Sequence, residues 1–506
     1  MADYGLGSWP SRRARIRGGT IALRQDGREL SYTQLSERVE HLARALADLG
    51  VRHGDRIAYL GLNDIATFEV FFAAGRLGAI FVPLNNRLSA PEVAYLLDDA
   101  EPRVLFCGPE HADLIAAVDP RRHGVRTIIT CSGPGSLAEL VEGGALLPDV
   151  RSDVALTDDA VILYTSGTTG RPKGAVLTHA NLTFNTMNQL AHVDVLSTDT
   201  TLCMCPLFHA TGLGQVSLPT LFKGGTVVVV PKFDAGGVLS AIARLGVTSF
   251  SAVPTMLQML CDHPTFANTD LSSLRFAIYG GSMVAERVAV AWQSRGVQIL
   301  QGYGMTEASP GVFLATPDGA MQRPVSVGVP QFFTDITVRP VPAQPDADGS
   351  GELLVCGLNV FRGYWNLPSD AFDTDGWFRS GDVLRVAEDG WAYVVDRIKD
   401  MIISGGENIY PAEVEAAINA LPGIVDSAVV GIPDDRWGEV GLAFVISETA
   451  RTEASLRAAL ATHLATFKIP KRIRFVDALP RNATGKVRKQ ELRTYVTEEM
   501  HLEHNR

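Results

Sequence analysis

A short loop rich in glycine and hydroxyl side chains is the first place where the sequence suggests chemistry. It has the sequence YTSGTTGRPKG from Tyr164 to Gly174 and directly follows the apolar run Val161 to Tyr164. Glycines let backbone N–H groups turn toward an anion, hydroxyls donate further hydrogen bonds, and Lys173 adds a positive charge. The loop therefore predicts a phosphate site, with an ordinary surface loop as the alternative. It is not a Walker A loop, because Pro172 stands where that motif requires a glycine.

Five further segments accompany this loop along the chain. They are Pro206 to Gly212 (PLFHATG), Gln301 to Glu307 (QGYGMTE), Trp377 to Asp382 (WFRSGD), Asp396 to Tyr410 (DRIKDMIISGGENIY) and Pro480 to Lys486 (PRNATGK). Together with the loop, and in this order, they resemble the motifs of the adenylate-forming enzymes, which include acyl-CoA synthetases, firefly luciferase and nonribosomal-peptide adenylation domains. The resemblance runs nearly end to end. Within the family, the chain is similar to bacterial feruloyl-CoA synthetases and to medium- and long-chain fatty-acyl-CoA ligases.

This resemblance implies a reaction in two steps. A carboxylate attacks the α-phosphate of ATP and releases pyrophosphate, and the thiol of coenzyme A then captures the acyl-adenylate, leaving acyl-CoA and AMP. No protein nucleophile takes part, so catalysis is expected to come from orientation and charge stabilisation. The expected activity is that of an acid–CoA ligase using ATP, Mg²⁺ and coenzyme A. A CoA-independent acyl-AMP ligase, or a non-catalytic adenylate-binding relative, is the alternative.

The resemblance also assigns single residues to the triphosphate and the metal ion. The β- and γ-phosphates would be held by Thr165, Ser166, Gly167, Thr168, Thr169, Gly170 and Lys173. Thr306 would bond the α-phosphate. Mg²⁺ would be held by Glu307 and Thr165, since such oxygen ligands suit a hard cation.

Adenine is expected where glycines follow two apolar strands. Tyr303, between Gly302 and Gly304, would stack on the base. Gly281 and Ser282 would let adenine and the acyl group approach the backbone, because a glycine has no side chain in the way. A tight turn is the alternative reading of these glycines.

A further group of residues toward the C-terminus is implied by the same resemblance. They are Asp382 (ribose), Arg397 (ribose and phosphate), Lys399 (hinge), Gly405 and Gly406 (room for pantetheine) and Lys486 (reacting carboxylate). In the family, the small domain rotates about the hinge between the two steps.

His209 would lie where the acyl pocket meets the channel for the thiol. We interpret it as a gate and pocket wall and not as a base; a histidine satisfied within an apolar core is the alternative. The expected lining, which includes Phe208 to Thr211 and Val253 to Met256, holds no Asp to pair an α-amino group. An amino-acid substrate is thus disfavoured. Hydroxycinnamate-type acids and fatty acids both stay open, since Thr211 stands where plant hydroxycinnamate ligases carry a tyrosine.

These residues need elements that present them along one edge of a sheet. Strand-like apolar runs alternate with helical periodicity, as in Arg56 to Leu60 followed by Ala66 to Leu77. The alternation predicts an α/β fold with doubly wound, mostly parallel sheets, whose ligands gather at the carboxyl ends of the strands. Ser31 and Gln34 predict a capping box and a helix that continues to Leu49.

The length and type of the predicted elements change twice toward the C-terminus. Beyond about Thr334, shorter strands predict a β-rich subdomain around a loop at Pro340 to Gly351. From Lys399 onward, helices at Pro411 to Ala420 and Ala454 to Ala465 alternate with strands and predict a small α+β domain. We therefore expect an AMP-binding and acyl-binding domain over residues 1–398 and a mobile catalytic domain over residues 399–506.

Composition limits the other possibilities. With 506 residues, 46% hydrophobic and 20% charged, and a net charge of −11, disorder and a nucleic-acid partner are disfavoured. Six cysteines without a CxxC pair favour a reducing, cytoplasmic location. Glu69 and Arg76 interrupt the apolar stretch Phe68 to Leu84, which disfavours a membrane span. An N-terminal arm with four arginines would be solvated or make a weak peripheral membrane contact. The oligomeric state, with a homodimer among the options, stays open.

Overall fold

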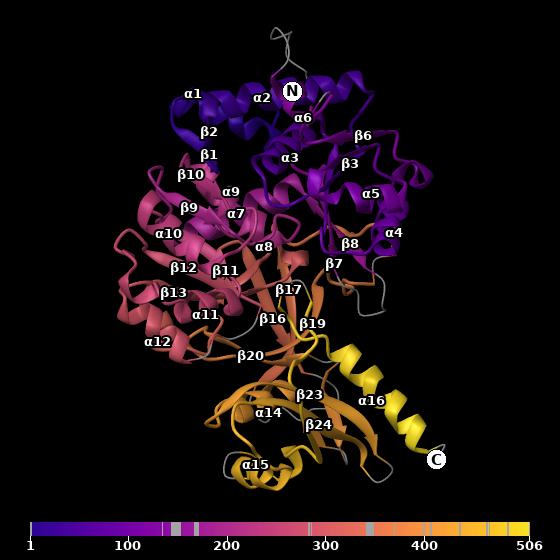
Figure 1. Ribbon diagram of the computed structural model, residues 1–506, viewed down its shortest axis with the longest axis vertical. Coiled ribbons are helices and arrows are strands. Elements are labelled where there is room, and N and C mark those ends of the chain that lie inside the picture. The colour runs from indigo at the N-terminus through magenta and orange to yellow at the C-terminus, as the bar shows by residue number, and fades with distance from the viewer. Residues whose placement is uncertain are drawn as a thin grey trace. The chain divides into compact units, whose positions relative to one another are not determined.

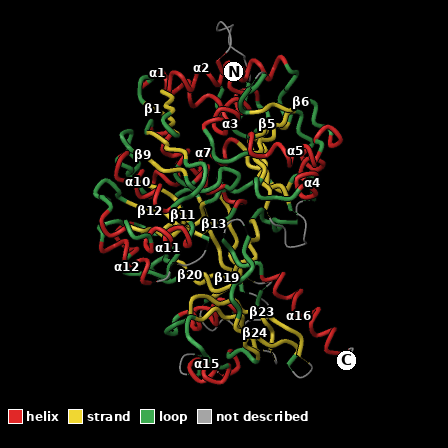
Figure 2. Tube along the Cα trace, viewed as in Figure 1, coloured by secondary structure: helices red, strands yellow, loops and turns green. Residues whose placement is uncertain are grey.

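The chain is divided into two compact units. The computed structural model describes residues 3–133, 135–142, 153–165, 172–281, 284, 286–340, 349–368, 370–397, 400–404, 407–434, 437–461, 464, 466–482 and 485–504. The first unit contains residues 1–335 and 356–378, and the second contains residues 336–355 and 379–506. Helices and strands alternate through most of the first unit (Figures 1 and 2).

A nine-stranded sheet forms one half of the first unit. In spatial order its strands are β15 (Val329–Pro330), β14 (Gly311–Leu314), β13 (Gln298–Gly304), β12 (Phe276–Gly280), β11 (Ser249–Ala252), β9 (Thr200–Cys203), β10 (Thr226–Val229), β1 (Ile21–Gln25) and β2 (Arg28–Ser31). The strands from β13 to β1 are parallel, and the pairs β13–β14, β14–β15 and β1–β2 are antiparallel.

A seven-stranded sheet forms the other half of the first unit. Its order is β18 (Gly363–Tyr364), β8 (Lys173–Thr178), β7 (Asp159–Thr165), β4 (Ile80–Leu84), β3 (Arg56–Leu60), β5 (Val104–Cys107) and β6 (Thr127–Thr130). The strands from β7 to β6 are parallel, whereas β8 is antiparallel to both β7 and β18. The predicted mostly parallel α/β fold is confirmed. The antiparallel strands lie at both edges of the nine-stranded sheet and at one edge of the seven-stranded sheet.

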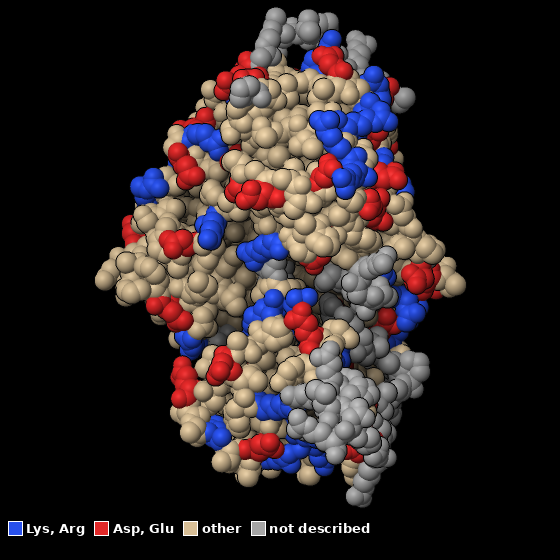
Figure 3. Space-filling model, turned by 45° about the vertical axis from the view of Figure 1, so that its right-hand side comes forward, with Lys and Arg blue, Asp and Glu red and all other residues tan. Residues whose placement is uncertain are grey.

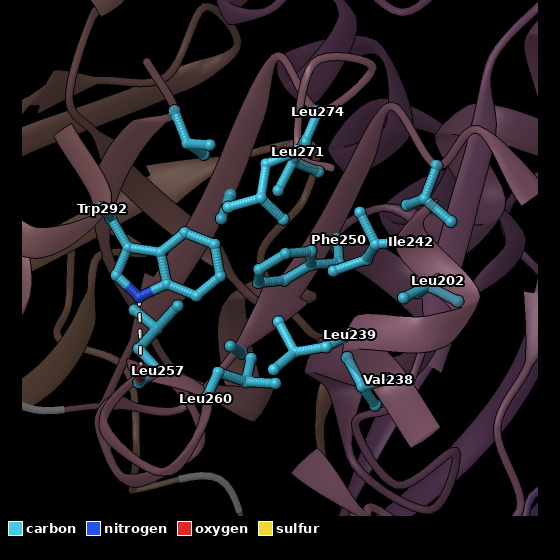
Figure 4. Packing of buried hydrophobic residues seen from close by; sticks show 14 of the residues in the cluster. Leu202, Val238, Leu239, Ile242, Phe250, Leu257, Leu260, Leu271, Leu274 and Trp292 are labelled. Carbon is cyan, nitrogen blue, oxygen red and sulfur yellow. Dashed lines mark hydrogen bonds between the residues drawn. The ribbon is translucent and has the colours of Figure 1, made fainter. Parts of the chain in front are cut away.

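Helices cover the sheets because the strands carry apolar residues on both of their faces. The helices of the first unit are α1 (Trp9–Arg17), α2 (Tyr32–Asp48), α3 (Ile65–Leu77), α4 (Ala90–Ala100), α5 (Ala112–Val118), α6 (Leu137–Glu142), α7 (His179–His192), α8 (Ala210–Gly214), α9 (Ser217–Lys223), α10 (Ala235–Leu245), α11 (Pro254–Asp262), α12 (Glu286–Ser294) and α13 (Pro317–Ala320). Phe250 of β11 and Trp292 of α12 belong to one buried cluster, in which the Trp292 indole N–H donates to the Leu257 carbonyl at 3.2 Å (Figure 4). Helices α10, α11 and α12 therefore pack on one face of the nine-stranded sheet.

The N-terminal arm is folded, which corrects the expectation of a solvated arm. The 3₁₀ turn Leu6–Ser8 leads directly into α1, and both Leu6 and Trp9 are buried. The Trp9 ring lies 5.0 Å from the ring of Phe222, and Arg13 lies over the same ring. Two buried apolar side chains within a short segment produce no periodic pattern. The arginines are therefore the visible feature of this segment in the sequence, and its packing could not be predicted from it.

The second unit contains two sheets. The first sheet has the order β16 (Thr334–Arg339), β17 (Ser350–Gly357), β19 (Phe378–Val386) and β20 (Ala392–Arg397), and the chain crosses between the two units within these strands. The second sheet has the order β22 (Glu407–Ile409), β21 (Ile402–Ser404), β24 (Gly438–Ser447) and β23 (Ile424–Asp434), with β25 (Arg472–Phe475) paired to β24. Its helices are α14 (Pro411–Asn419), α15 (Glu453–Leu460) and α16 (Lys489–His504). The predicted β-rich subdomain and C-terminal α+β region are both present.

One predicted helix is too long. Helix α15 ends at Leu460 with Ala461 as its C-cap, not at Ala465. The backbone N–H of Ala461 donates to carbonyls of the last helical turn, which completes the helix there. The apolar side chains alone, continued by Leu464, suggested a longer run.

Charged side chains of both signs are interspersed over the surface that Figure 3 presents. The net charge of −11 is therefore not gathered there into a single acidic field. Within the part of the chain that the structure describes, no helix combines the length and the apolar character needed to span a bilayer.

Candidate active site

Lys173 begins β8 at the exit of the predicted phosphate loop. Strands β7 and β8 form an antiparallel pair in which Thr165 lies opposite Lys173 and Tyr164 lies opposite Gly174. The Thr165 hydroxyl donates to the Lys173 carbonyl at 3.4 Å. The two ends of the loop are thereby held together, and both predicted residues lie at the mouth of one hairpin.

Glu307 lies in a tight turn after β13. The turn is the 3₁₀ helix Thr306–Ala308, capped by Ser309 in the left-handed region at φ 70°. Asn359, which is fully buried, donates to the carbonyls of Ala308 at 3.0 Å and Gly311 at 2.7 Å. These bonds satisfy backbone groups that the short helix leaves open. The backbone that carries Glu307 is therefore fixed on its C-terminal side.

Tyr364 of β18 contacts both predicted residues. Its hydroxyl donates to Glu307 Oε1 at 2.7 Å, and Lys173 Nζ lies 5.2 Å from the centre of its ring. Burial and the neighbouring Glu307 raise the pKa of Tyr364 well above its usual value, so the phenol keeps its proton and acts as a donor. The structure thus brings a cation to the ring and a carboxylate to the hydroxyl of one aromatic side chain.

The glycines expected near adenine follow two neighbouring strands. Gly280 of β12 lies opposite Gly302 of β13, and Gly281 has a φ of 94°, which a side chain would disfavour. A Cβ at Gly304 would lie 1.7 Å from the Pro310 carbonyl oxygen. The close approach of the Pro310 carbonyl therefore explains Gly304 without any ligand. Tyr303, partly buried, lies on the same strand with its ring 5.9 Å from that of Phe313.

His209 lies at the N-terminus of α8, and two asparagines hold its surroundings. Asn63 accepts from the Leu207 N–H at 2.8 Å and donates to the Cys205 carbonyl at 2.9 Å. Asn185 donates to the Gly214 carbonyl at 2.9 Å and accepts from the Gly311 N–H at 3.2 Å. The second asparagine therefore links the end of α8 to the strand that follows the Glu307 turn.

Asp382 and Arg397 lie opposite each other in the second unit, on β19 and β20. Asp382 is only 3% exposed, and its backbone N–H donates to the Ser380 hydroxyl at 3.1 Å. Gly381, between Ser380 and Asp382, has a φ of 69°, which permits the sharp turn that this bond requires. The two residues assigned to the ribose are thus brought together by strand pairing, although the side chain of Arg397 lies outside the described part of the structure.

Lys486 lies in a turn whose backbone is held on both sides. Its N–H donates to Asn482 Oδ1 at 2.9 Å, and its carbonyl accepts from the Asn482 N–H at 2.9 Å. Gly485 has a φ of 81°, and the Lys486 side chain is exposed. The turn therefore fixes the backbone of Lys486 at the surface of the second unit.

Several predicted residues lie outside the described part of the structure. They are Ser166, Gly167, Thr168, Thr169, Gly170, Ser282, Lys399, Gly405 and Gly406. Their assigned roles stay predictions.

Three residues of the site were missed in the sequence. Tyr364, Asn63 and Asn185 lie outside the five motifs, and each acts through a contact between distant segments. Tyr364 carried a weak signal, because it stands in the dipeptide Gly363-Tyr364 just before the polar Asn366. The asparagines carried none, since their partners are backbone groups.

The donors suit the ligands expected from the sequence. Glu307 offers a carboxylate and Thr165 a hydroxyl, the oxygen ligands that Mg²⁺ prefers, and Lys173 offers the charge that a triphosphate needs. Among the described residues, Tyr364 is the one hydrogen-bond partner of the Glu307 carboxylate.

Known proteins resemble this chain over nearly its whole length. The AMP-binding enzyme family matches residues 10–365, and the AMP-binding enzyme C-terminal domain matches residues 413–486. A feruloyl-CoA synthase of Amycolatopsis is 47% identical over 97% of this chain and 99% of its own length. An indoleacetate–CoA ligase of Aromatoleum aromaticum is 39% identical over 98% and 99%, and a long-chain fatty-acid–CoA ligase of Mycobacterium tuberculosis is 36% identical over 92% of each chain.

Solved structures extend the comparison. MatB of Rhodopseudomonas palustris with ATP bound has a TM-score of 0.89 and 33% identity over 97% of this chain and 98% of its own. The o-succinylbenzoate coenzyme A synthetase of Bacillus subtilis with ATP and a magnesium ion has a TM-score of 0.85 and 31% identity over 96% and 99%. The predicted family and reaction class are confirmed. This chain belongs to the family of AMP-binding enzymes and is an ATP-dependent, AMP-forming acid–CoA ligase.

Proposed function

We propose that the acid activated by this ligase is an aromatic acid of the hydroxycinnamate type. The observation that carries the proposal is the 47% identity to a feruloyl-CoA synthase over 97% of the chain. The indoleacetate–CoA ligase, at 39% identity, also takes an aryl acid. The buried ring of Phe208, 4.6 Å from the His209 ring, offers an aromatic surface in the expected pocket wall. A fatty acid is the second candidate, supported by the 36% identical ligase.

Competition between acids tests the substrate class. Ferulate, benzoate, octanoate and palmitate are supplied with ATP, Mg²⁺ and coenzyme A, and kcat/KM is measured for each from pyrophosphate release and thioester formation. We expect ferulate to exceed palmitate by at least about tenfold, a difference of about 1.4 kcal/mol in transition-state binding. The reverse order would favour the fatty acid. Omission of coenzyme A tests the requirement for the thiol. An acid–CoA ligase needs coenzyme A for turnover, whereas a CoA-independent acyl-AMP ligase would form acyl-adenylate at the same rate with and without it.

The first unit is proposed to bind the triphosphate. Lys173 would neutralise phosphate charge, Thr306 would bond the α-phosphate, and Glu307 with Thr165 would hold Mg²⁺. When bound, the cation would supply further charge neutralisation on the phosphates. Tyr364 would keep Glu307 oriented by donating to one oxygen while leaving the other for the metal. The 2.7 Å bond between them supports this role.

The second unit is proposed to act in both steps. Asp382 would accept the ribose hydroxyls, whose donor groups suit a buried carboxylate. Lys486 would stabilise the charge that develops during adenylation, and the region of Gly405 and Gly406 would serve the thiol step. Lys399 would be the hinge between the two. We accordingly propose a functional boundary at 398/399. The compact units are divided differently, because residues 336–355 and the chain from residue 379 onward belong to the second unit.

We further propose a cytoplasmic location. All six cysteines are unpaired, as expected for a reducing compartment. Coenzyme A is the expected acyl acceptor of the second step.

A further inference from the structure

Helix α4 holds the backbone on both sides of Lys173. Before it, the Tyr95 hydroxyl donates to the Pro172 carbonyl at 3.2 Å. After it, the Trp365 N–H donates to the Gly174 carbonyl at 2.7 Å, and the Trp365 indole N–H donates to the Asp99 carbonyl at 3.0 Å. Both peptide neighbours of Lys173 are therefore tied to α4, one directly and the other through Trp365.

The Asp99 side chain adds a third tie. Its Oδ2 accepts from the Tyr164 hydroxyl at 2.6 Å, and Tyr164 lies opposite Gly174 in the β7–β8 pair. Burial, followed by the bond to Asp99, raises the pKa of Tyr164 far above its usual value, so this phenol also stays a donor. The strand on each side of the loop is thus anchored to the same helix.

Helix α4 is itself firmly seated. Its side chains Val93, Leu96, Leu97 and Ala100 are buried against β3, β4 and β5. A capping box between Ser89 and Glu92 closes its first turn. Tyr95 and Asp99 are four residues apart and so share one helix face. They are therefore presented as a rigid pair.

We propose that Tyr95 and Asp99 are positioning residues for Lys173 in the binding of ATP. Neither belongs to a motif of the sequence. The inference rests on the proposed role of Lys173 at the phosphates. Because Lys173 also lies over Tyr364, which bonds Glu307, a shift of its backbone would be felt at both charges of the site.

The test compares Tyr95→Phe and Asp99→Ala with the matched control Asp98→Ala in the full-length protein. Asp98 is the next residue on the same helix, is 63% exposed and pairs with His123 at 2.7 Å. We expect the KM for ATP to rise about 3- to 10-fold in the two variants, as loss of one internal hydrogen bond can cause. The KM for the acid should change little, and the control should resemble the wild type. An unchanged KM for ATP in both variants would overturn the inference.

A second comparison separates positioning from general support. In a Lys173→Ala background, Tyr95→Phe should raise the KM for ATP no further, because the group it positions is gone. Full additivity of the two changes would overturn the inference. An unchanged KM for ATP in Lys173→Ala alone would instead overturn the proposed role of Lys173. Should Asp99→Ala fail to fold, Asp99→Asn, which keeps an acceptor for Tyr164, replaces it and should show a smaller rise in the same parameter.

Discussion

Tyr364 is a neutral side chain that acts on two charged ones. Its hydroxyl holds one oxygen of Glu307, and its ring lies beneath Lys173. If Glu307 holds Mg²⁺ as proposed, Tyr364 would affect the affinity for the metal without touching it. The hydroxyl and the ring can be separated experimentally, because phenylalanine retains the ring.

Removal of the Tyr364 hydroxyl should therefore weaken the response to magnesium. In Tyr364→Phe, we expect the Mg²⁺ concentration for half-maximal activity to rise about 3- to 10-fold, since Glu307 loses its hydrogen bond. The measurement is a Mg²⁺ titration at saturating ATP. Tyr393→Phe, which removes the hydroxyl of a tyrosine in the second unit whose ring lies beside Arg385, is the control. An unchanged Mg²⁺ requirement would argue against the orienting role.

At the scale of elements, two glycines of β13, Gly302 and Gly304, differ in the space around them. A Cβ at Gly304 would meet the Pro310 carbonyl at 1.7 Å, whereas the nearest atom to a Cβ at Gly302 is 3.5 Å away. The backbone can accept a methyl group at the second position only. This difference offers a way to separate folding from ligand binding.

Gly304→Ala should destabilise the protein, and Gly302→Ala should not. Overpacking of this kind costs about 1–3 kcal/mol, so we expect a lowered thermal midpoint for the first variant. The second should keep the wild-type midpoint, and any loss of ATP affinity there would then report a steric effect on the nucleotide. Thermal unfolding with and without ATP checks both. Equal midpoints for the two variants would contradict the steric argument.

The N-terminal segment is anchored to α7 through a neutral histidine. The Leu6 N–H donates to His179 Nδ1 at 3.1 Å, which places the ring proton on Nε2. Burial, partly opposed by Asp158, lowers the pKa of His179 to about 4. In the unfolded chain the ring has its ordinary pKa of about 6.5. Between these values the unfolded state binds more protons, so stability must fall as the pH is lowered.

The wild-type protein should accordingly lose about 2 kcal/mol of stability through this residue between pH 8 and pH 5. His179→Gln retains an acceptor but cannot titrate, and its stability should depend less on pH by that amount. Urea unfolding at pH 8, 6.5 and 5 measures the difference. Parallel pH dependences for the two proteins would exclude His179 as the cause.

At the scale of the whole molecule, the residues proposed for the reaction come from two units. Lys173 and Glu307, which are proposed to act at the triphosphate, belong to the first unit, and Lys486 belongs to the second. If Lys486 serves adenylation alone, the two half-reactions should respond differently to its loss.

Lys486→Ala should slow adenylation by at least about 100-fold, as removal of a preorganised donor to a charged transition state can do. Thioester formation from supplied acyl-adenylate should be largely retained. Pyrophosphate release and thioester formation are measured separately. Arg488→Ala, an exposed neighbour that pairs with Glu491, is the control. An equal loss in both half-reactions would show that Lys486 is not specific to the first.

Much of the architecture could be predicted because its signals are local. The capping box of Ser31 and Gln34 is present and begins α2, and β3 matches the predicted run Arg56 to Leu60. The packed N-terminal segment and the end of α15 could not be predicted in the same way. Their outcome depends on burial by distant residues and on how the last helical turn is completed.

The sequence by itself determined the family and the reaction class, and it predicted the residue types at the nucleotide. The predicted phosphate loop carries such information because its glycines, hydroxyls and lysine lie close along the chain, where they can surround one phosphate group. Tertiary structure decided which side chains support them. Tyr364, Tyr95 and Asp99 reach Glu307 and the flanks of Lys173 only because β18 pairs with β8 and α4 lies against the same sheet. Such contacts follow from strand order and register, which join segments far apart in the chain.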